Sequence, residues 1–369
     1  MQTKLSHFLV TGGYNEKRSD GIRTYKWNPD TEKLSLCFIE EDCQNPSYLV
    51  LHPESGIIYA ANETEYDAKI TAHKLNSEDG TLKSLPSLEK KEGEQKENVG
   101  TRGAGMCHMC LNKKGTAIYG GNYNSGNILA FSINEDGSVG SLLSNVYHKG
   151  FSSHERQASP HVHQVLFDKD ENYLIAVDFG VDTLYAYKVD EKGAILPETV
   201  VKSQVPKGEG PRHLVFSQDY KDAYVITELG CKILHMKYHS NTGTFTLQNS
   251  LSLLEGEVRE ENTGAELMFS KSDGFLYASL RGTNEIVAVK TKENGEDEIK
   301  EMSIVNRFSC FGQMPRMFSF NEDGRYMFIA NQQSGDVTVV KMENQRGREC
   351  EKIMVDSVSF AMILGLQEH

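Results

Sequence analysis

The sequence lacks several features that would place it in other classes of protein. No apolar run approaches the ~18 consecutive residues that a membrane-spanning helix requires, so we expect no membrane-spanning segment. Residues 1–11 lack the basic start and long apolar stretch of a secretory signal peptide, which leads us to expect a cytoplasmic protein. No Gly-rich phosphate-binding loop is present, and we expect no cofactor.

Cysteine is scarce and scattered. The seven cysteines are odd in number and follow no disulfide framework, which favours reduced thiols. Cys107 and Cys110 form a lone CxxC, without the second pair or the histidine pair that a zinc site needs. His161 and His163 share one face of a strand, but no motif supplies a third metal ligand. No metal is therefore expected.

Basic residues are outnumbered, with 39 Lys and Arg against 52 Asp and Glu, a formal net charge of −13. This excess of negative charge disfavours binding to nucleic acid or to an anionic membrane surface. Solubility is the simplest interpretation of the surface charge. The length of 369 residues does not by itself set the number of domains, because all-β propellers fold as long single units.

An apolar, tyrosine-rich segment that ends in a polar residue recurs along the chain. The first two copies are residues 56–62 (GIIYAAN) and 115–122 (GTAIYGGN). The last residues of the six copies, called register residues below, are Asn62, Asn122, Asp178, Glu228, Arg281 and Asn331. Their successive spacings are 60, 56, 50, 53 and 50 residues, a period typical of propeller blades.

Each copy lies within a longer unit of strands. A turn rich in Gly, Asn, Ser or Asp follows it, and then an alternating strand such as 127–131 or 336–340, which predicts a hairpin. A short strand precedes each copy, for example 163–167, and residues 34–40 and their counterparts predict a fourth. The repeat therefore predicts four-stranded antiparallel blades. No convincing helix is present, and the charged residues 89–102 are predicted to form a long surface loop between blades.

The two ends of the chain are predicted to complete a seventh blade. Residues 8–14 and 21–25 match the second half of a repeat, and residues 358–364 form an apolar, strand-like segment at the C-terminus. Pairing of these segments would close a ring and remove exposed strand edges. A solenoid is the competing architecture, but its ends need polar capping repeats. We therefore predict one all-β, seven-bladed propeller domain over residues 1–369, closed by the N- and C-terminal strands.

Polar residues gather at two places in each repeat. One is the register residue, and the other is the start of the preceding strand, as in 45–47, 107–108, 160–163, 210–213 and 314–316. Four such pairs are 15 residues apart (62−47, 122−107, 178−163 and 331−316), and 228−212 gives 16. Equivalent positions should converge on one channel mouth, where arginines, histidines and a carboxylate would bind an anion and supply an acid or base. The alternative, turn caps and channel-filling ion pairs without an enzymatic role, stays open.

Several of these motifs together resemble those of one family. They are Ser159-Pro160-His161-Val162-His163, Gly210-Pro211-Arg212-His213-Leu214, Glu228-Leu229, Arg281-Gly282, and Pro315-Arg316 ahead of Ala330-Asn331-Gln332. The chain resembles the lactonase-type seven-bladed propellers, which include 6-phosphogluconolactonase and fungal 3-carboxy-cis,cis-muconate lactonizing enzyme. The likeness extends from residue 11 to residue 340. Two residues beside these motifs differ from the family pattern. Leu280 precedes Arg281 where the family often has Asn, and Met317 follows Arg316 where the family often has His.

The resemblance implies a function and a set of site residues. The catalytic set is predicted to be His161, Arg212, Glu228 and Arg281. The repeated polar positions, and not the resemblance, supply the predicted substrate-binding set of His163, Arg316, Asn122 and Asp178. The expected reaction is hydrolysis of a sugar lactone, with 6-phosphoglucono-δ-lactone of the pentose phosphate pathway as the leading candidate.

In this interpretation the arginines hold the phosphate and polarise the carbonyl, while Glu228 or His161 takes a proton from water. The partner is then a small anionic substrate. The alternatives are a muconate-type cycloisomerase with the same anion recognition, and a propeller that serves only as an interaction scaffold. The sequence makes no prediction of the oligomeric state.

Overall fold

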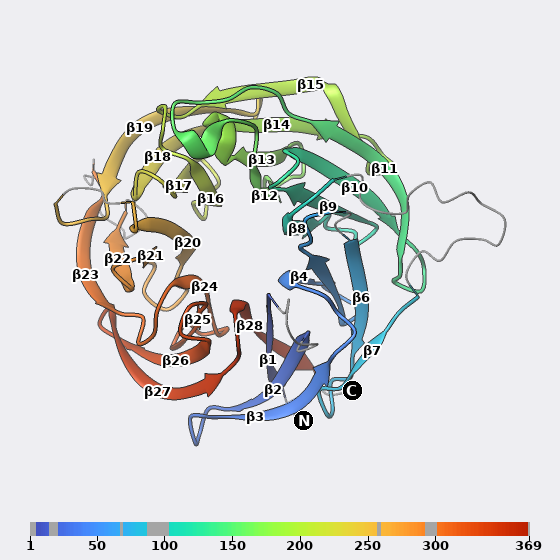
Figure 1. Ribbon diagram of the computed structural model, residues 1–369, viewed down its shortest axis with the longest axis vertical. Helices are drawn as coiled ribbons and strands as arrows, with labels where there is room; N and C mark the ends of the chain where they lie inside the picture. The colour runs from blue at the N-terminus through green and yellow to red at the C-terminus, as the bar shows by residue number, and fades with distance from the viewer. Residues whose placement is uncertain are drawn as a thin grey trace.

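The computed structural model describes residues 5–14, 21–66, 69–86, 103–256, 260–291 and 301–367. In these residues 28 strands form seven four-stranded antiparallel sheets, arranged as blades around a central axis (Figure 1). This arrangement confirms the predicted seven-bladed propeller and excludes the solenoid. The loop predicted at residues 89–102 lies outside the described residues. No helix in the described part of the chain is long and apolar enough to span a membrane.

The strands occupy four positions in a blade, from the central axis outward. The innermost strands are β28 (Val358–Gln367), β4 (Pro46–Leu51), β8 (Met106–Leu111), β12 (Val162–Phe167), β16 (Pro211–Phe216), β20 (Thr263–Phe269) and β24 (Pro315–Phe320). The second strands are β1 (Leu5–Gly13), β5 (Ile57–Asn62), β9 (Ala117–Asn122), β13 (Leu174–Asp178), β17 (Asp222–Thr227), β21 (Leu276–Arg281) and β25 (Tyr326–Asn331).

The two outer positions complete each blade. The third strands are β2 (Ile22–Asn28), β6 (Lys69–Leu75), β10 (Asn127–Ile133), β14 (Thr183–Val189), β18 (Lys232–His239), β22 (Glu285–Lys290) and β26 (Asp336–Glu343). The outermost are β3 (Lys33–Glu40), β7 (Leu82–Ser84), β11 (Val139–Tyr147), β15 (Ile195–Gln204), β19 (Thr244–Ser252), β23 (Ser303–Ser309) and β27 (Arg346–Met354). The two 3₁₀ turns are η1 (Glu155–Gln157) and η2 (Phe179–Val181).

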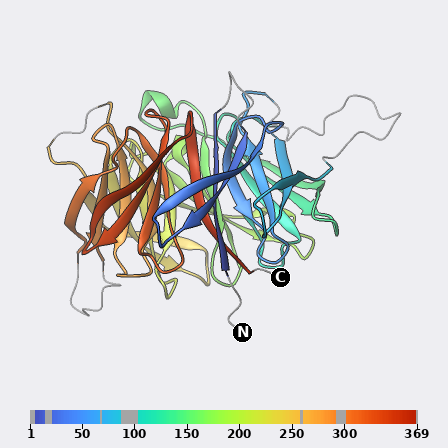
Figure 2. The same cartoon turned by 90° about the horizontal axis from the view of Figure 1, so that it is seen from below.

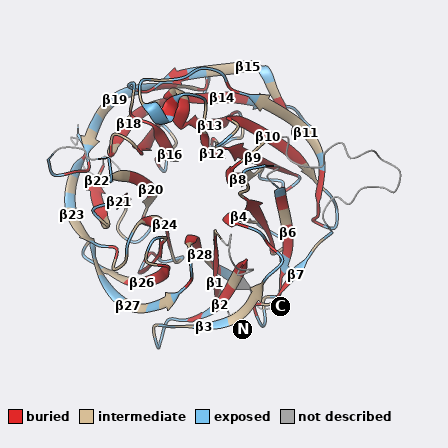
Figure 3. Ribbon diagram, in the orientation of Figure 1, coloured by how far each residue is buried: buried red, intermediate tan, exposed pale blue. Residues whose placement is uncertain are grey.

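Burial explains why the second strands have the clearest sequence pattern. All six residues of β5, and likewise of β9, are buried, because the neighbouring blades cover both faces of each sheet. The apolar side chains form seven clusters that lie between adjacent blades. The outermost strands have many exposed residues (Figure 3). The core is therefore a ring of blade interfaces around the channel.

The ring closes through the two ends of the chain. β28 pairs antiparallel with β1, from Leu5 opposite Gln367 to Gly12 opposite Phe360, and so becomes the innermost strand of the blade that β1, β2 and β3 complete. This confirms the predicted closure. The innermost strands all begin at the same face of the ring, called the site face below, and β28 ends at the opposite face (Figure 2, site face uppermost).

We expect Phe360→Ala to destabilise the protein by about 3–5 kcal/mol, because it would leave a cavity in the closing blade. The Phe360 side chain is fully buried and packs edge-on against Tyr48, with ring centroids 5.0 Å apart. Urea unfolding would measure the change, and Phe151→Ala is the matched control because Phe151 is 77% exposed. Equal effects of the two substitutions would contradict this account of closure.

Candidate active site

A β-bulge interrupts the start of every innermost strand. In the first complete blade Pro46 pairs with Asn62 and Tyr48 pairs with Ala61, so that Ser47 has no partner in the ladder. The other six blades show the same shift of register. The residues at this position, called bulge residues below, are Ser47, Cys107, His163, Arg212, Ala265, Arg316 and Ser359. A bulge re-aims the extra side chain, and six of these seven line one narrow cavity on the axis.

A second ring of side chains lies above the bulge residues. Its members, called rim residues below, are Tyr14, Glu63, Tyr123, Phe179, Glu228, Arg281 and Gln332. Six of them donate their backbone N–H to the carbonyl two residues before the bulge, as Glu63 does to Asn45 at 2.9 Å and Glu228 to Gly210 at 2.7 Å. Arg281 takes the same place by pairing with Thr263. One repeated hydrogen bond thus places all seven at the site face.

This ladder corrects the register residues inferred from the sequence. Thr227, not Glu228, pairs with Pro211 and is the counterpart of Asn62. Glu228 and Arg281 belong to the rim, whose residues follow their bulge residues by 16 positions (63−47, 123−107, 179−163, 228−212, 281−265 and 332−316). The spacing of 16 for Glu228 was therefore the signal of a second ring. The sequence grouping missed Glu63 and Tyr123 because they stand one residue beyond the pattern used.

Two predicted substrate-binding residues, Asp178 and Asn122, are the last residues of second strands β13 and β9. Asp178 is fully buried, and its Oδ1 accepts hydrogen bonds from the backbone N–H of His161 at 2.8 Å and of Gly180 at 2.9 Å. Its Oδ2 lies 2.7 Å from His148 Nδ1. A Cβ at Gly180 would approach the backbone oxygen of Ser159 to 1.9 Å, so this loop requires glycine. Asp178 thereby fixes the backbone of the His161 segment.

Asn122 is also fully buried, and its Nδ2 donates to Asn127 Oδ1 at 3.0 Å. The contacts described for Asn122 and Asp178 join neither side chain to the arginines. The other six residues predicted from the sequence lie at the site face, whereas these two side chains make hydrogen bonds to neighbouring segments of the chain.

Glu228 is the centre of an ion-pair cluster. Its Oε2 lies 2.9 Å from Arg281 Nη2 and 3.3 Å from Arg212 Nε, and its Oε1 lies 2.6 Å from Arg156 Nη2. The side chains of Arg212 and Arg281 are only 3% and 7% exposed. Backbone carbonyls of β20 orient them, because Arg212 Nη1 donates to Ala265 O at 2.6 Å and Arg281 Nη2 donates to Gly264 O at 2.9 Å. Arg156, from η1, was not predicted from the sequence.

The cluster remains charged at neutral pH. Burial opposes ionisation of Glu228, but the attraction of Arg281, Arg212 and Arg156 outweighs it and lowers the pKa of Glu228 to about 2. Burial, together with the repulsion of Arg281 and Arg316, lowers the pKa of Arg212 to about 10. A carboxylate with so low a pKa is a weak base, so Glu228 is better suited to holding arginines than to accepting a proton from water.

Arg316 forms a second polar group on the other side of the rim. Its Nη2 donates to the Tyr14 hydroxyl at 2.8 Å, and that hydroxyl donates to Glu63 Oε2 at 2.7 Å. The guanidinium also lies over the Tyr14 ring, 5.4 Å from its centroid. Burial raises the pKa of Tyr14, so the phenol stays protonated. A bulge residue and two rim residues are thus linked by hydrogen bonds.

The two predicted histidines have different environments. His161 Nδ1 donates to the Tyr123 carbonyl oxygen at 2.7 Å, and its ring stacks on Tyr123 at 4.5 Å. In the neutral ring this leaves Nε2 as the basic nitrogen, 3.4 Å from Ser159 Oγ. His163 lines the axial cavity, and its Nδ1 has no hydrogen-bond partner among the described residues. Burial, aided by the charge of Arg212, lowers the pKa of His163 well below its ordinary value.

The residues that follow the bulges pack into a floor beneath the site. His213 Nδ1 lies 3.0 Å from Glu266 Oε1, and the His213 ring lies 5.4 Å from that of His108. His108 in turn packs on Tyr48 at 4.1 Å. Met317, one of the two departures from the family pattern, lines the same cavity. Cys107 and Cys110 are free thiols, and the described residues contain no group of three or more His, Cys, Asp or Glu arranged to hold a metal ion.

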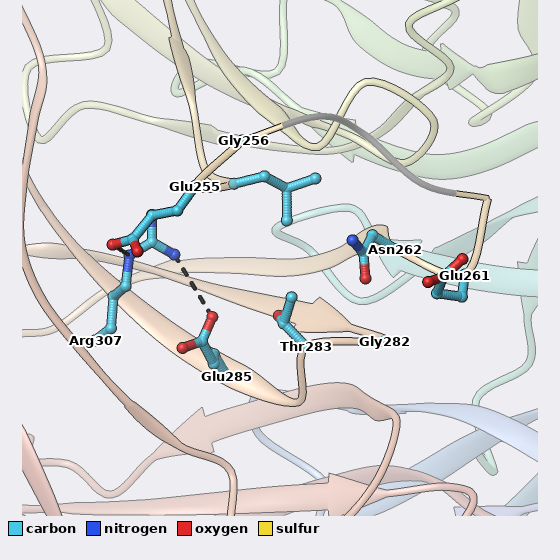
Figure 4. A pocket seen from close by; sticks show the side chains of 9 residues that line it. Glu255, Gly256, Glu261, Asn262, Gly282, Thr283, Glu285 and Arg307 are labelled. Carbon is cyan, nitrogen blue, oxygen red and sulfur yellow. Dashed lines mark ion pairs between the residues drawn. The ribbon is translucent and has the colours of Figure 1, made fainter.

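Another surface pocket, of about 620 Å³, has no bulge or rim residue among the described residues that line it (Figure 4). Glu255, Glu261 and Glu285 line it, and Arg307 Nε and Nη1 lie 3.4 Å and 3.6 Å from the carboxylates of Glu255 and Glu285. Three carboxylates against one guanidinium disfavour an anionic ligand. The arginine cluster at the rim has the opposite balance of charge, with Arg156, Arg212 and Arg281 around Glu228.

The low pKa of Glu228 predicts a specific pH dependence of stability. Because the folded pKa of about 2 is below the ordinary value of 4.5, ionised Glu228 stabilises the fold above pH 4.5, and this contribution is lost as the pH falls toward 2. We expect Glu228→Gln to lower the free energy of unfolding by about 3 kcal/mol at neutral pH. The difference from the wild type should shrink below about pH 4.5 in urea unfolding.

Glu54→Gln is the control, because Glu54 is an exposed carboxylate in the turn between β4 and β5. A difference between Glu228→Gln and the wild type that stayed constant down to about pH 3 would show that the arginines do not hold the pKa of Glu228 low.

Comparison with known proteins places this architecture in a family. The family model described as lactonase, 7-bladed beta-propeller, matches residues 8–354. A Bacillus subtilis protein named 6-phosphogluconolactonase is 27% identical over 337 residues, which cover 91% of each chain. A Formosa agariphila protein of the same name is 25% identical over 350 residues, 92% of this chain and 94% of that one.

Among solved structures, the periplasmic gluconolactonase of Pseudomonas aeruginosa is 25% identical and superimposes with a TM-score of 0.85, covering 98% of this chain and 99% of that one. The match to the family model extends over nearly all the blades described above. The chain belongs to the seven-bladed β-propeller lactonase family.

Proposed function

We propose that the protein hydrolyses a phosphorylated sugar lactone, and that its substrate is 6-phosphoglucono-δ-lactone, which opens to 6-phosphogluconate in the pentose phosphate pathway. The observation that carries the proposal is the convergence of Arg156, Arg212, Arg281 and Arg316 on one channel mouth of a chain whose formal net charge is −13. Buried arginines are costly unless they have anionic partners. Glu228 and Glu63 supply only part of the compensating charge at the rim.

Unpartnered buried atoms also support a ligand at this place. Ser47 Oγ, His163 Nδ1, Arg281 Nε and Gln332 Oε1 are buried and have no hydrogen-bond partner among the described residues. All four belong to bulge or rim residues, on four different blades. Such groups are rare in proteins and call for a reason, and a bound polar substrate provides one. A sugar lactone presents several hydroxyl groups and one carbonyl to such atoms.

The arginines have two tasks in this proposal. A guanidinium binds phosphate through two parallel hydrogen bonds, which gives both charge and orientation. Guanidiniums already fixed by carbonyls of β20, as in Arg212 and Arg281, also stabilise the negative charge that develops on the lactone carbonyl oxygen. Because the carbonyls hold them before substrate arrives, little reorganisation accompanies the reaction.

His161 is the better candidate for the base. Its Nδ1–H is committed to the Tyr123 carbonyl, so that Nε2 can accept a proton. Water adds its oxygen to the lactone carbonyl carbon and gives a proton to Nε2. The bond between that carbon and the ring oxygen then breaks, and the ring oxygen takes the proton from Nε2 and leaves as a hydroxyl group, which restores neutral His161. Glu228, which forms ion pairs with three arginines, keeps their guanidinium groups in position.

Other features agree with a cytoplasmic pathway. All seven cysteines are free thiols, as in proteins of reducing compartments. The relative named a periplasmic gluconolactonase has the same fold, so the fold does not indicate a compartment. The proposed cytoplasmic location is therefore argued from the free thiols alone.

The test is the rate at which the purified protein accelerates the hydrolysis of freshly generated 6-phosphoglucono-δ-lactone, coupled through oxidation of the product to reduction of NADP. We expect Arg281→Ala to lower kcat/KM by about 10²–10³-fold, because it removes a hydrogen-bond donor to the phosphate and to the developing negative charge on the lactone carbonyl oxygen. Arg325→Ala is the matched control, since Arg325 is 69% exposed and lies in the turn between β24 and β25, at the opposite face.

Acceleration that is lost in Arg281→Ala and kept in Arg325→Ala would support the lactonase and its site together. No acceleration over spontaneous opening by the folded wild type would overturn the proposed substrate. The muconate-type reaction and the scaffold role would then have to be tested.

A further inference from the structure

Arg156 differs from the other arginines of the site in its origin. It lies in η1, in the loop between β11 and β12, and not on a repeated position of a blade. The backbone of this turn is fixed. His154 Nδ1 accepts the N–H of Arg156 at 3.1 Å, and the Gln157 side chain donates to the Phe179 carbonyl at 2.7 Å and to Asp182 Oδ1 at 2.8 Å. The side chain of Arg156 thus extends over the rim from a rigid base.

The exposure of Arg156 also differs. Its side chain is 41% exposed, against 3% for Arg212 and 7% for Arg281. The other neighbours of its guanidinium are rim residues, namely the Tyr123 hydroxyl at 3.4 Å and the Phe179 ring at 4.9 Å. An anion that enters from solvent therefore meets Arg156 before it reaches the two buried arginines.

The contacts of Glu228 divide in the same way. The two buried arginines contact Oε2, whereas the contact described for Oε1 is that with Arg156. If Arg156 turns away, Glu228 keeps two cationic partners and its charge stays compensated. Oε1 then becomes available to a hydroxyl donor. Moving Arg156 is therefore much less costly than moving Arg212 or Arg281, whose guanidiniums are also held by backbone carbonyls.

We propose that Arg156 exchanges partners when substrate binds. Its guanidinium moves away from Glu228 Oε1 and binds the phosphate of the substrate, and a sugar hydroxyl then donates to Oε1 in place of Arg156. The proposal rests on the proposed function and makes Arg156 the residue that distinguishes phosphorylated from unphosphorylated lactones. A phosphate monoester carries a charge of about −1.5 to −2 and three terminal oxygens, so it competes well with one carboxylate oxygen for a guanidinium.

The first experiment compares two substrates. We expect Arg156→Ala to raise KM for 6-phosphoglucono-δ-lactone by about 10- to 100-fold, the loss typical of a charge-assisted contact, with a smaller change in kcat. For unphosphorylated glucono-δ-lactone both constants should change by less than about 3-fold. Arg156→Lys should recover part of the loss, and Arg325→Ala should match the wild type. Equal losses for the two lactones, or no loss for either, would overturn the proposal.

The second experiment needs no turnover. Calorimetry at constant ionic strength would measure the binding of inorganic phosphate to the wild type and to the Arg156→Ala, Glu228→Gln and double variants. We expect Arg156→Ala to weaken binding by about 10-fold or more. Glu228→Gln should tighten binding because it removes the competing carboxylate, and part of this gain should depend on Arg156.

The two experiments distinguish a failure of the proposed lactonase function from a failure of the proposed partner exchange of Arg156. If the wild type hydrolyses neither lactone, the proposed function fails, and phosphate binding still decides the role of Arg156. Phosphate affinity that is unchanged in a folded Arg156→Ala variant, or strictly additive effects of the two substitutions, would overturn the exchange even in an active lactonase.

Discussion

The β-bulge at the start of each innermost strand determines what lines the channel. A regular strand would alternate its side chains between the two neighbouring blade interfaces, which are apolar. The bulge adds one residue and turns it toward the axis, and the next backbone hydrogen bond then sets the rim residue above it. Because the bulge and this hydrogen bond are both formed by the backbone, they do not depend on which side chain stands at either position. The channel mouth can therefore hold Ser, Cys, His or Arg at equivalent positions without a change of fold.

The choice of side chains at those positions creates an electrostatic site. Arg212 and Arg316 are bulge residues, and Glu228, Arg281 and Glu63 are rim residues, so charges that are far apart in the sequence meet within a few ångström. Their desolvation is compensated by ion pairs and by carbonyls of β20. The result is a set of donors oriented in advance, which is the arrangement that stabilises developing negative charge without reorganisation.

The sequence predicted the fold almost completely because the fold is repetitive. The buried second strands recur six times with the same apolar, tyrosine-rich pattern, and the apolar segment near the C-terminus completes the seventh blade. Arg212, Arg281 and Arg316 were found because Pro-Arg and Arg-Gly motifs mark repeated positions. Glu63 and Tyr14 were missed because a bulge shifts the ladder by one residue, and nothing in the composition of a strand marks that shift.

Asn122 and Asp178 show what the sequence leaves open. Both are polar residues in apolar strands and are predicted to bind substrate. In the structure Asn122 Nδ2 donates to Asn127 of β10, whereas Asp178 accepts from the backbone of His161 and Gly180. A buried polar side chain needs a hydrogen-bond partner, and the sequence does not tell whether a ligand or the chain itself provides it. The structure shows the partners that the chain provides, and the substrate-binding role of both residues stays a prediction.

Arg156 illustrates why the substrate is harder to predict than the fold. Relatives named for a phosphorylated and for an unphosphorylated lactone match this chain over more than nine-tenths of its length at similar identity. The blades are common to the family, so the blades alone do not explain such a difference. The loop between β11 and β12, which carries Arg156, lies outside the repeated strands of the blades. In the proposed exchange, a charge that is carried on this loop and reaches the rim selects among anions while the backbone of the site stays the same.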